Sequence, residues 1–353
     1  MSRVLFLIHG MGVHGTDWAQ EVTDKLGEVA TRYDRFPSLE ALQEAVEFVP
    51  ITYDHVFKGQ LQRWADAADN LREFTRENEI DLGRGAVLFD WIAGASKEEE
   101  NFFWSHTIDV ILYHYVREVQ SQVRLHVMHQ IADALAARET NGRRVESSVL
   151  AHSLGTAVAH DSLHILGTVP LDGNESFLTP GNQLFESFIT LANVSRVLQT
   201  VANPHESIVV PRSASRPRGY VRRYYNFRHA LDPIPAFWPF GPSGWAPKLV
   251  SDLGLDFLRD VNVHGFAHYL DGPRVHIPIL NEVVPGAIPD DEAAAAIAGY
   301  PTVGGSACAD GVAELVESAR KILATIGSSK DPKRLVTAGA EFLAAAESAA
   351  DAC

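Results

Sequence analysis

The chain has 353 residues, of which 46% are hydrophobic and 21% charged, proportions typical of a globular protein with a buried core. Its formal net charge of −15 excludes a general nucleic-acid binder, because neutralising phosphates requires a basic surface. Cys308 and Cys353 lack the spacing of a zinc or redox site. No signal peptide and no apolar run of roughly 20 residues is recognisable, so we expect a cytoplasmic protein without a transmembrane segment.

The first elements of the chain alternate between strand and helix. Residues 4–8 are all apolar and predict a buried strand, which leads into a glycine-rich loop at 9–12. Asp17 is the expected N-cap of a helix, and residues 46–52 predict a second strand. This order is typical of a parallel α/β sheet. Further strands are predicted at 145–151, 188–194 and 224–227, with a helix at 154–167.

Two largely helical segments are expected besides the sheet. Residues 56–140 predict a helical insertion or cap, in which apolar residues at spacings of three and four indicate a long amphipathic helix over about 101–138. An alanine-rich acidic sequence predicts a C-terminal helical extension over 286–353. Because no internal repeat and no long linker is recognisable, residues 1–353 are expected to form one domain with an insertion and an extension.

The sequence Ala151-His152-Ser153-Leu154-Gly155 lies between a predicted strand and a predicted helix. A serine hydroxyl is a weak nucleophile that has to be presented to a base. A sharp strand-to-helix turn presents it when the residues two positions before and after the serine are small. Ala151 departs from the usual glycine by a single methyl group. Ser153 is therefore the candidate nucleophile.

A serine that attacks a carbonyl creates a negative oxygen, which needs preorganised donors. The backbone N–H of Leu154, at the start of the predicted helix, is one expected donor, and the N–H of Met11, in the glycine-rich loop, is the other. His9, Gly10 and His152 flank this position. They are expected either to line a pocket or to be held by local hydrogen bonds.

The His-Gly loop after the first strand and the turn at 151–155 resemble those of the α/β-hydrolase superfamily, especially its lipases and esterases. The resemblance covers residues 1–53 and 144–280, and it implies a mostly parallel sheet flanked by helices. It also implies a triad in the order serine, acid, histidine. Asp232, in a loop after a predicted strand, is the expected acid, and His268, which is followed by tyrosine, is the expected base.

Other residues remain alternatives for these two roles. The rivals for the acid are Asp252, Asp256 and Asp260, and those for the base are His264, His229 and His276. His264 and His268 are four residues apart, as in some zinc-binding helices. No glutamate follows His264, however, and Gly265 disfavours a helix there, so no metal site is expected.

Two further segments bear on the substrate. The aromatic, proline-rich sequence 237–245, with Phe237 and Trp238, predicts either a lid or acyl pocket or ordinary core packing. The arginines between residues 212 and 228 are expected either to bind an anionic head group or to pair with local acids.

The expected function is hydrolysis of a small-molecule or lipid-like carboxylic ester through an acyl-enzyme, without a cofactor or a metal. An acyltransferase with the same triad and a non-catalytic binding protein of the same fold are the alternatives. Acyl length, head group and oligomeric state remain open.

Overall fold

The computed structural model describes residues 3–10, 17–60, 62–63, 66, 73, 113, 116–139, 145–169, 183–198, 201–229, 232, 235, 240–241, 245, 247–255, 264–300 and 317. Within these residues a six-stranded sheet runs in the order β2-β1-β3-β4-β5-β6, and every neighbouring pair is parallel. The strands are β1 (Arg3–Ile8), β2 (Val46–Ile51), β3 (Ser147–His152), β4 (Phe185–Leu191), β5 (Val221–His229) and β6 (Val250–Leu255).

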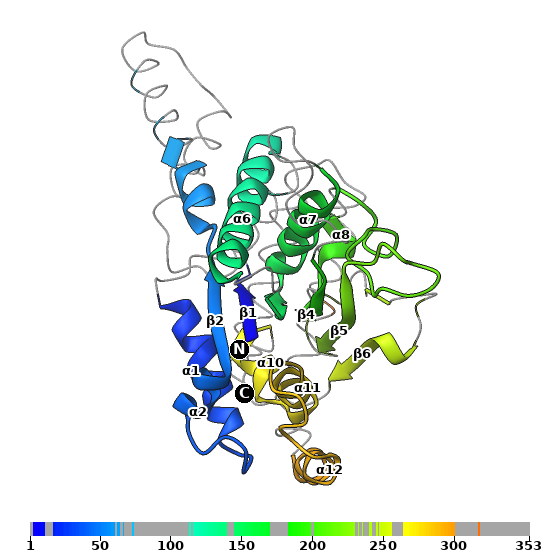
Figure 1. Cartoon of the computed structure of the whole chain (residues 1–353). Helices are drawn as coiled ribbons and strands as arrows, with labels where there is room; N and C mark the ends of the chain where they lie inside the picture. The colour runs from blue at the N-terminus through cyan, green and yellow to red at the C-terminus, as the bar shows by residue number, and fades with distance from the viewer. Residues whose placement is uncertain are drawn as a thin grey trace.

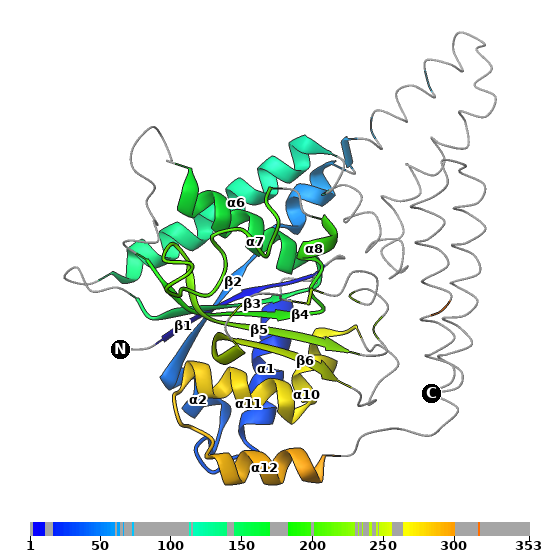
Figure 2. The same ribbon diagram turned by 90° about the vertical axis from the view of Figure 1, so that its right-hand side faces the viewer.

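Helices cover both faces of the sheet (Figures 1 and 2). One layer holds α6 (Arg117–Arg138), α7 (Leu154–Thr168) and α8 (Ser195–Leu198). The other holds α1 (Trp18–Ala30), α2 (Leu39–Ala45), α10 (Phe266–Asp271), α11 (Pro273–Val283) and α12 (Asp290–Gly299). A short 3-10 helix, η2 (Pro247–Leu249), precedes β6.

The central strand β1 is apolar from Val4 to Ile8 because both of its faces are covered. Phe6 of β1 belongs to the core beneath α6 and α7, whereas its neighbours Leu5 and Leu7 belong to the core beneath α1 and α11. Alternating side chains of one strand therefore fill two separate cores, as expected for a parallel sheet between helical layers.

These findings confirm the predicted α/β fold and five of its strands, with β4 lying three residues earlier than expected. β6 was not predicted. The long predicted helix is described from Arg117 onward as α6, and its earlier part lies outside the described residues. The same holds for most of the proposed 56–140 insertion. Of the proposed C-terminal extension over 286–353, only residues 286–300, which include α12, and Glu317 are described.

A buried ion pair joins the two long helices of one layer. Arg124 of α6 donates to Asp161 of α7 over 2.9 Å, and the Tyr113 hydroxyl donates to the same carboxylate over 2.8 Å. All three side chains are buried. Charges in such surroundings are tolerated only when they are paired and hydrogen-bonded, so this cluster fixes how α6 lies against α7.

No helix within the described residues is long and apolar enough to cross a membrane.

His276 of α11 makes the stability of the fold depend on pH. It donates from Nδ1 to the Leu270 carbonyl (2.8 Å) and accepts at Nε2 from the Tyr33 hydroxyl (2.6 Å), as a neutral imidazole does. Burial lowers the pKa of His276 to about 4. Between about pH 6.5 and 4 the unfolded chain therefore binds more protons than the folded one, and the free energy of unfolding falls as the pH drops.

We expect His276→Asn to weaken this dependence. Urea unfolding across that pH window should show a smaller loss of stability in the variant than in the wild type, even if the variant is less stable at neutral pH. An identical slope in both proteins would show that His276 is not responsible.

Candidate active site

Ser153 lies in a strained turn at the carboxyl end of β3. It is the N-cap of α7 and has φ 51° and ψ −126°, a conformation that non-glycine residues rarely adopt. The Ser153 N–H donates to the Leu191 carbonyl at the end of β4 (2.9 Å), and the Thr156 hydroxyl donates to the Ser153 carbonyl (2.7 Å). These contacts hold the serine at the edge of the sheet where functional groups of parallel α/β proteins gather.

Two glycines allow this turn to pack tightly. A β-carbon on Gly155 would lie 2.1 Å from the His9 carbonyl oxygen, and one on Gly10 would lie 2.8 Å from the β-carbon of Ser153. Neither separation is possible between non-bonded atoms without movement of the backbone. Gly155 thus lets α7 approach β1, and Gly10 lets the loop after β1 approach the serine.

Three side chains from distant parts of the chain form a continuous hydrogen-bonded chain. His264 Nε2 lies 2.8 Å from the Ser153 hydroxyl oxygen, and His264 Nδ1 lies 2.9 Å from an Asp232 carboxylate oxygen. Since a carboxylate accepts, Nδ1 carries the proton and Nε2 accepts from the hydroxyl. Such an imidazole can take the serine proton while the carboxylate stabilises the resulting charge.

His264, and not His268, occupies the position beside Ser153. Gly265 is the N-cap of α10, so His264 lies in the turn before the helix, whereas His268 lies within it. The two side chains therefore point in different directions. The ring of His268 packs edge-on against His229, with centroids 5.2 Å apart. The contact with Ser153 that was expected of His268 is therefore made by His264, and Asp232 contacts the other ring nitrogen of His264.

Tyr269 supports the carboxylate from its other side. Its buried hydroxyl donates to Asp232 over 2.8 Å and accepts from the His229 backbone N–H over 3.0 Å. Burial, reinforced by the charge of Asp232, raises the pKa of Tyr269 well above its usual value. The phenol therefore stays protonated near neutral pH, where it donates to Asp232 and positions it.

Removing this hydroxyl tests the positioning role. If Ser153, His264 and Asp232 catalyse a reaction, Tyr269→Phe should lower kcat by about tenfold, the usual worth of a hydrogen bond to a charged group, without changing KM. Steady-state kinetics on a soluble ester measure both constants. A rise in KM with kcat unchanged would mean that Tyr269 acts on substrate binding instead.

His152 supports the histidine. Its Nε2 donates to the His264 backbone carbonyl over 2.6 Å, and its ring stacks on Phe266 with centroids 5.0 Å apart. His152 is buried. It therefore fixes the backbone from which the His264 side chain extends.

His9 is built into the loop after β1. Its ring stacks on Tyr53 with centroids 4.2 Å apart, its Nδ1 lies 2.8 Å from the Gly10 carbonyl, and its Nε2 lies 3.2 Å from Asp54. The Tyr53 hydroxyl donates to the His9 carbonyl over 2.7 Å. These contacts fix Gly10 against Ser153. Leu154 is the first residue of α7, and its N–H belongs to the helix terminus.

Several predicted site residues are not placed by the structure. Met11, Phe237, Trp238, Asp256 and Asp260 lie outside the described residues. The other rivals make contacts elsewhere. Asp252 accepts from Asn226 over 2.8 Å, and the His229 ring packs against His268. His276 contacts Leu270 and Tyr33. Within the described part of the chain, no group of three or more His, Cys, Asp or Glu side chains could hold a metal ion.

The arginines of β5 pair with local acids. Arg222 lies 3.0 Å from Glu186, Arg223 lies 2.6 Å from Glu282, and Arg228 lies 3.6 Å from Asp252. These three charges therefore have partners within the protein.

A second serine–histidine–aspartate contact has no counterpart among the motifs of the sequence. His160 Nε2 lies 2.9 Å from the Ser207 hydroxyl, and His160 Nδ1 lies 3.2 Å from Asp161. Adjacent His160 and Asp161 in a helix, with Ser207 in a distant loop, form no recognisable motif. The carboxylate of Asp161 is already paired with Arg124, and Ser207 does not begin a helix.

Comparisons with known proteins do not identify a family. No protein-family model matches the chain, and neither a curated protein nor a solved structure matches it. The function has to be inferred from the residues and contacts of the site itself.

Proposed function

We propose that the protein is a serine hydrolase of the α/β-hydrolase type that cleaves a carboxylic ester. Ser153 is the nucleophile, His264 the general base and Asp232 the acid that orients it. The observation that carries the proposal is the unbroken hydrogen-bonded chain from Ser153 through His264 to Asp232, which begins at a strained turn between a strand and a helix.

The reaction has two halves. In the first, the Ser153 oxygen forms a bond to the ester carbonyl carbon and its proton passes to His264 Nε2; the protonated imidazole then gives this proton to the departing alcohol as the ester C–O bond breaks. In the second, His264 takes a proton from water, the water oxygen attacks the acyl-enzyme, and the proton returns to Ser153 as the carboxylic acid leaves.

The negative oxygen formed in each half needs donors near Ser153. The N–H of Leu154 opens α7, where backbone donors and the helix dipole favour negative charge. The family resemblance suggests Met11 as the source of the second donor, and the close approach of Gly10 to Ser153 supports a role for this loop.

Geometry favours Ser153 over Ser207. Ser153 has a positive φ and precedes a helix, so its hydroxyl stands at a helix N-terminus. Ser207 instead caps its own turn, where the Val209 N–H donates to its hydroxyl over 3.1 Å. Ser207 therefore differs from Ser153 both in backbone conformation and in its position relative to a helix.

Ester turnover tests the proposal. A series of p-nitrophenyl esters of increasing acyl length should be hydrolysed by the wild type and by Ser207→Ala, but not by Ser153→Ala. Ser153 has 0% of its surface exposed, so the groups that cover it have to move before a substrate can reach it. The acyl length that is hydrolysed fastest will indicate how large a space this movement opens. Equal turnover by Ser153→Ala and the wild type would overturn the proposal. Adding an alcohol acceptor distinguishes hydrolysis from acyl transfer by the product formed.

A further inference from the structure

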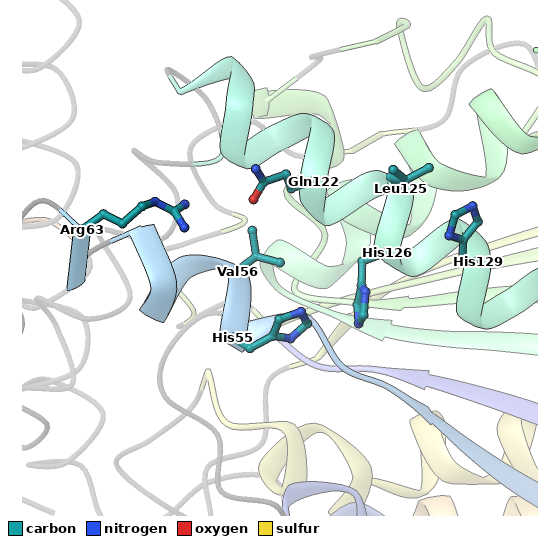
Figure 3. Close-up of a pocket in the computed structure, with 7 residues that line it drawn as sticks. All are labelled: His55, Val56, Arg63, Gln122, Leu125, His126 and His129. Carbon is teal, nitrogen blue, oxygen red and sulfur yellow. The ribbon is translucent and has the colours of Figure 1, made fainter.

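A pocket of about 330 Å³ opens between residues 54–63 and α6, beyond the carboxyl end of the edge strand β2 (Figure 3). Its volume falls at the lower end of the range of small-molecule sites. Its lining residues within the described chain are His55, Val56, Arg63, Gln122, Leu125, His126 and His129.

The lining is basic in an acidic protein. The whole chain has 45 acidic and 30 basic residues, yet the described lining has one guanidinium, three imidazoles and no carboxylate. The partner that the structure gives Arg63 is neutral, since its Nη2 donates to the Gln60 side chain over 2.7 Å. Figure 3 shows Arg63 directed toward Val56 and Gln122, and His55 facing His126.

The acidic residues of the two flanking segments do not line the pocket. Glu118 accepts from the side-chain amide of Gln122, one turn away along α6, over 2.7 Å. Asp54 lies 3.2 Å from Nε2 of His9, in the loop after β1. The charged residues of residues 54–66 and α6 outside the lining are Asp54, Lys58, Asp66, Arg117, Glu118, Arg124, Asp133 and Arg138. A negative charge facing the imidazoles is therefore missing from the described lining.

The imidazoles act on one another. The His55 and His126 ring centroids lie 4.3 Å apart. Burial, together with the charges of His55 and His129, lowers the pKa of His126. A bound anion would offset this repulsion, so its binding and the protonation of His126 should favour each other.

The same pocket has an apolar side. Val56 is buried in its wall, and Leu125 is 49% exposed, one of two large hydrophobic side chains exposed to this degree within the described residues. A metal ion is a poorer fit than an anion, because no three His, Cys, Asp or Glu side chains of the described chain converge on one point.

We propose that this pocket binds a small organic anion, a carboxylate or phosphate monoester carried on an apolar group. The anionic oxygens lie between Arg63 and the imidazoles of His55 and His126, and the apolar group lies on Val56 and Leu125. The proposal is independent of the chemistry proposed for Ser153.

Isothermal titration calorimetry on the full chain, at about pH 6 and pH 8, tests the site with hexyl phosphate, hexanoate, inorganic phosphate and hexylamine. We expect one or both hexyl anions to bind, more tightly at the lower pH, and hexylamine to give no heat. The tighter hexyl anion identifies the head group. Inorganic phosphate should bind more weakly than hexyl phosphate because it lacks the apolar part.

Variants locate the binding. Arg63→Gln should weaken binding by about tenfold, the usual effect of losing a hydrogen bond from a charged group, and Leu125→Ser should weaken hexyl phosphate but not inorganic phosphate. Arg218→Gln, which removes the same charge from an exposed loop, is the control. Unchanged binding by Arg63→Gln, equal binding of hexylamine, or no heat with either hexyl anion would overturn the proposal. Binding abolished by covalent modification of Ser153 but retained by Arg63→Gln would assign the anion to the Ser153 site instead.

Discussion

Replacing His264 by alanine is expected to lower kcat for ester hydrolysis by about 10⁴-fold or more, the scale of loss when a base that acts with a serine nucleophile is removed. His264 is the imidazole within hydrogen-bond distance of the Ser153 hydroxyl, at 2.8 Å. Without it, the hydroxyl has no acceptor for its proton, and the departing alcohol has no donor.

His268→Asn is the matched comparison, because the two histidines are only four residues apart and both are buried. This variant should retain kcat near the wild-type value, since the His268 ring packs against His229. Thermal unfolding of each variant shows whether it is folded. A large loss of kcat in a folded His268→Asn variant, with activity retained by His264→Ala, would reverse the assignment.

Gly155→Ala should destabilise the protein by about 3 kcal/mol or more, at the upper end of the usual cost of overpacking. The added β-carbon would lie 2.1 Å from the His9 carbonyl oxygen and 2.8 Å from that of Ile8. Both are backbone atoms of a central strand and its loop, so neither can turn aside as a flexible side chain would. Either α7 moves away from β1 or the loop beside Ser153 is displaced.

Gly299→Ala provides the control for this substitution. Gly299 also lies in a helix, α12, and a β-carbon there meets no atom within 4 Å. Because alanine favours a helix over glycine, this variant should be as stable as the wild type or more stable by up to about 1 kcal/mol. Urea unfolding of both variants compares the two sites directly. A Gly155→Ala variant as stable as Gly299→Ala would contradict the close packing of α7 on β1.

Part of the sheet was predictable because some of its strands contain short runs of consecutive apolar residues. Residues 4–8 are apolar throughout, residues 149–151 form such a run at the end of the predicted strand 145–151, and both segments belong to central strands. β6 lacks such a run: Val250–Leu255 contains Ser251, Asp252 and Gly254, and it lies at the edge of the sheet with only its last residue buried. A strand with one neighbour and partial burial leaves little periodic signal in its sequence.

The candidate site was predictable in part. The turn at Ser153 was evident because its flanking strand, helix and small residues are local features of the sequence. The choice between His264 and His268 was not, because it depends on where α10 begins. Gly265 was expected to disfavour a helix at this point, but it is the N-cap at which α10 begins. The residue before the helix and a residue inside it then face different parts of the molecule.

The contacts that support His264 and Asp232 could not be predicted from the sequence. Tyr269 reaches Asp232 across 37 residues, and the His152 side chain reaches the His264 carbonyl across 112 residues. Such pairs have no spacing rule, since they depend on the packing of α10 against the ends of the strands.

The most direct test of the central claim is covalent labelling by a small fluorophosphonate, followed by mass spectrometry of the digested protein. If Ser153 is an activated nucleophile, the wild type should gain one phosphonyl group on the peptide that contains Ser153, and both Ser153→Ala and His264→Ala should remain unlabelled. Labelling of Ser207 instead, or no labelling of the folded wild-type protein, would contradict the claim.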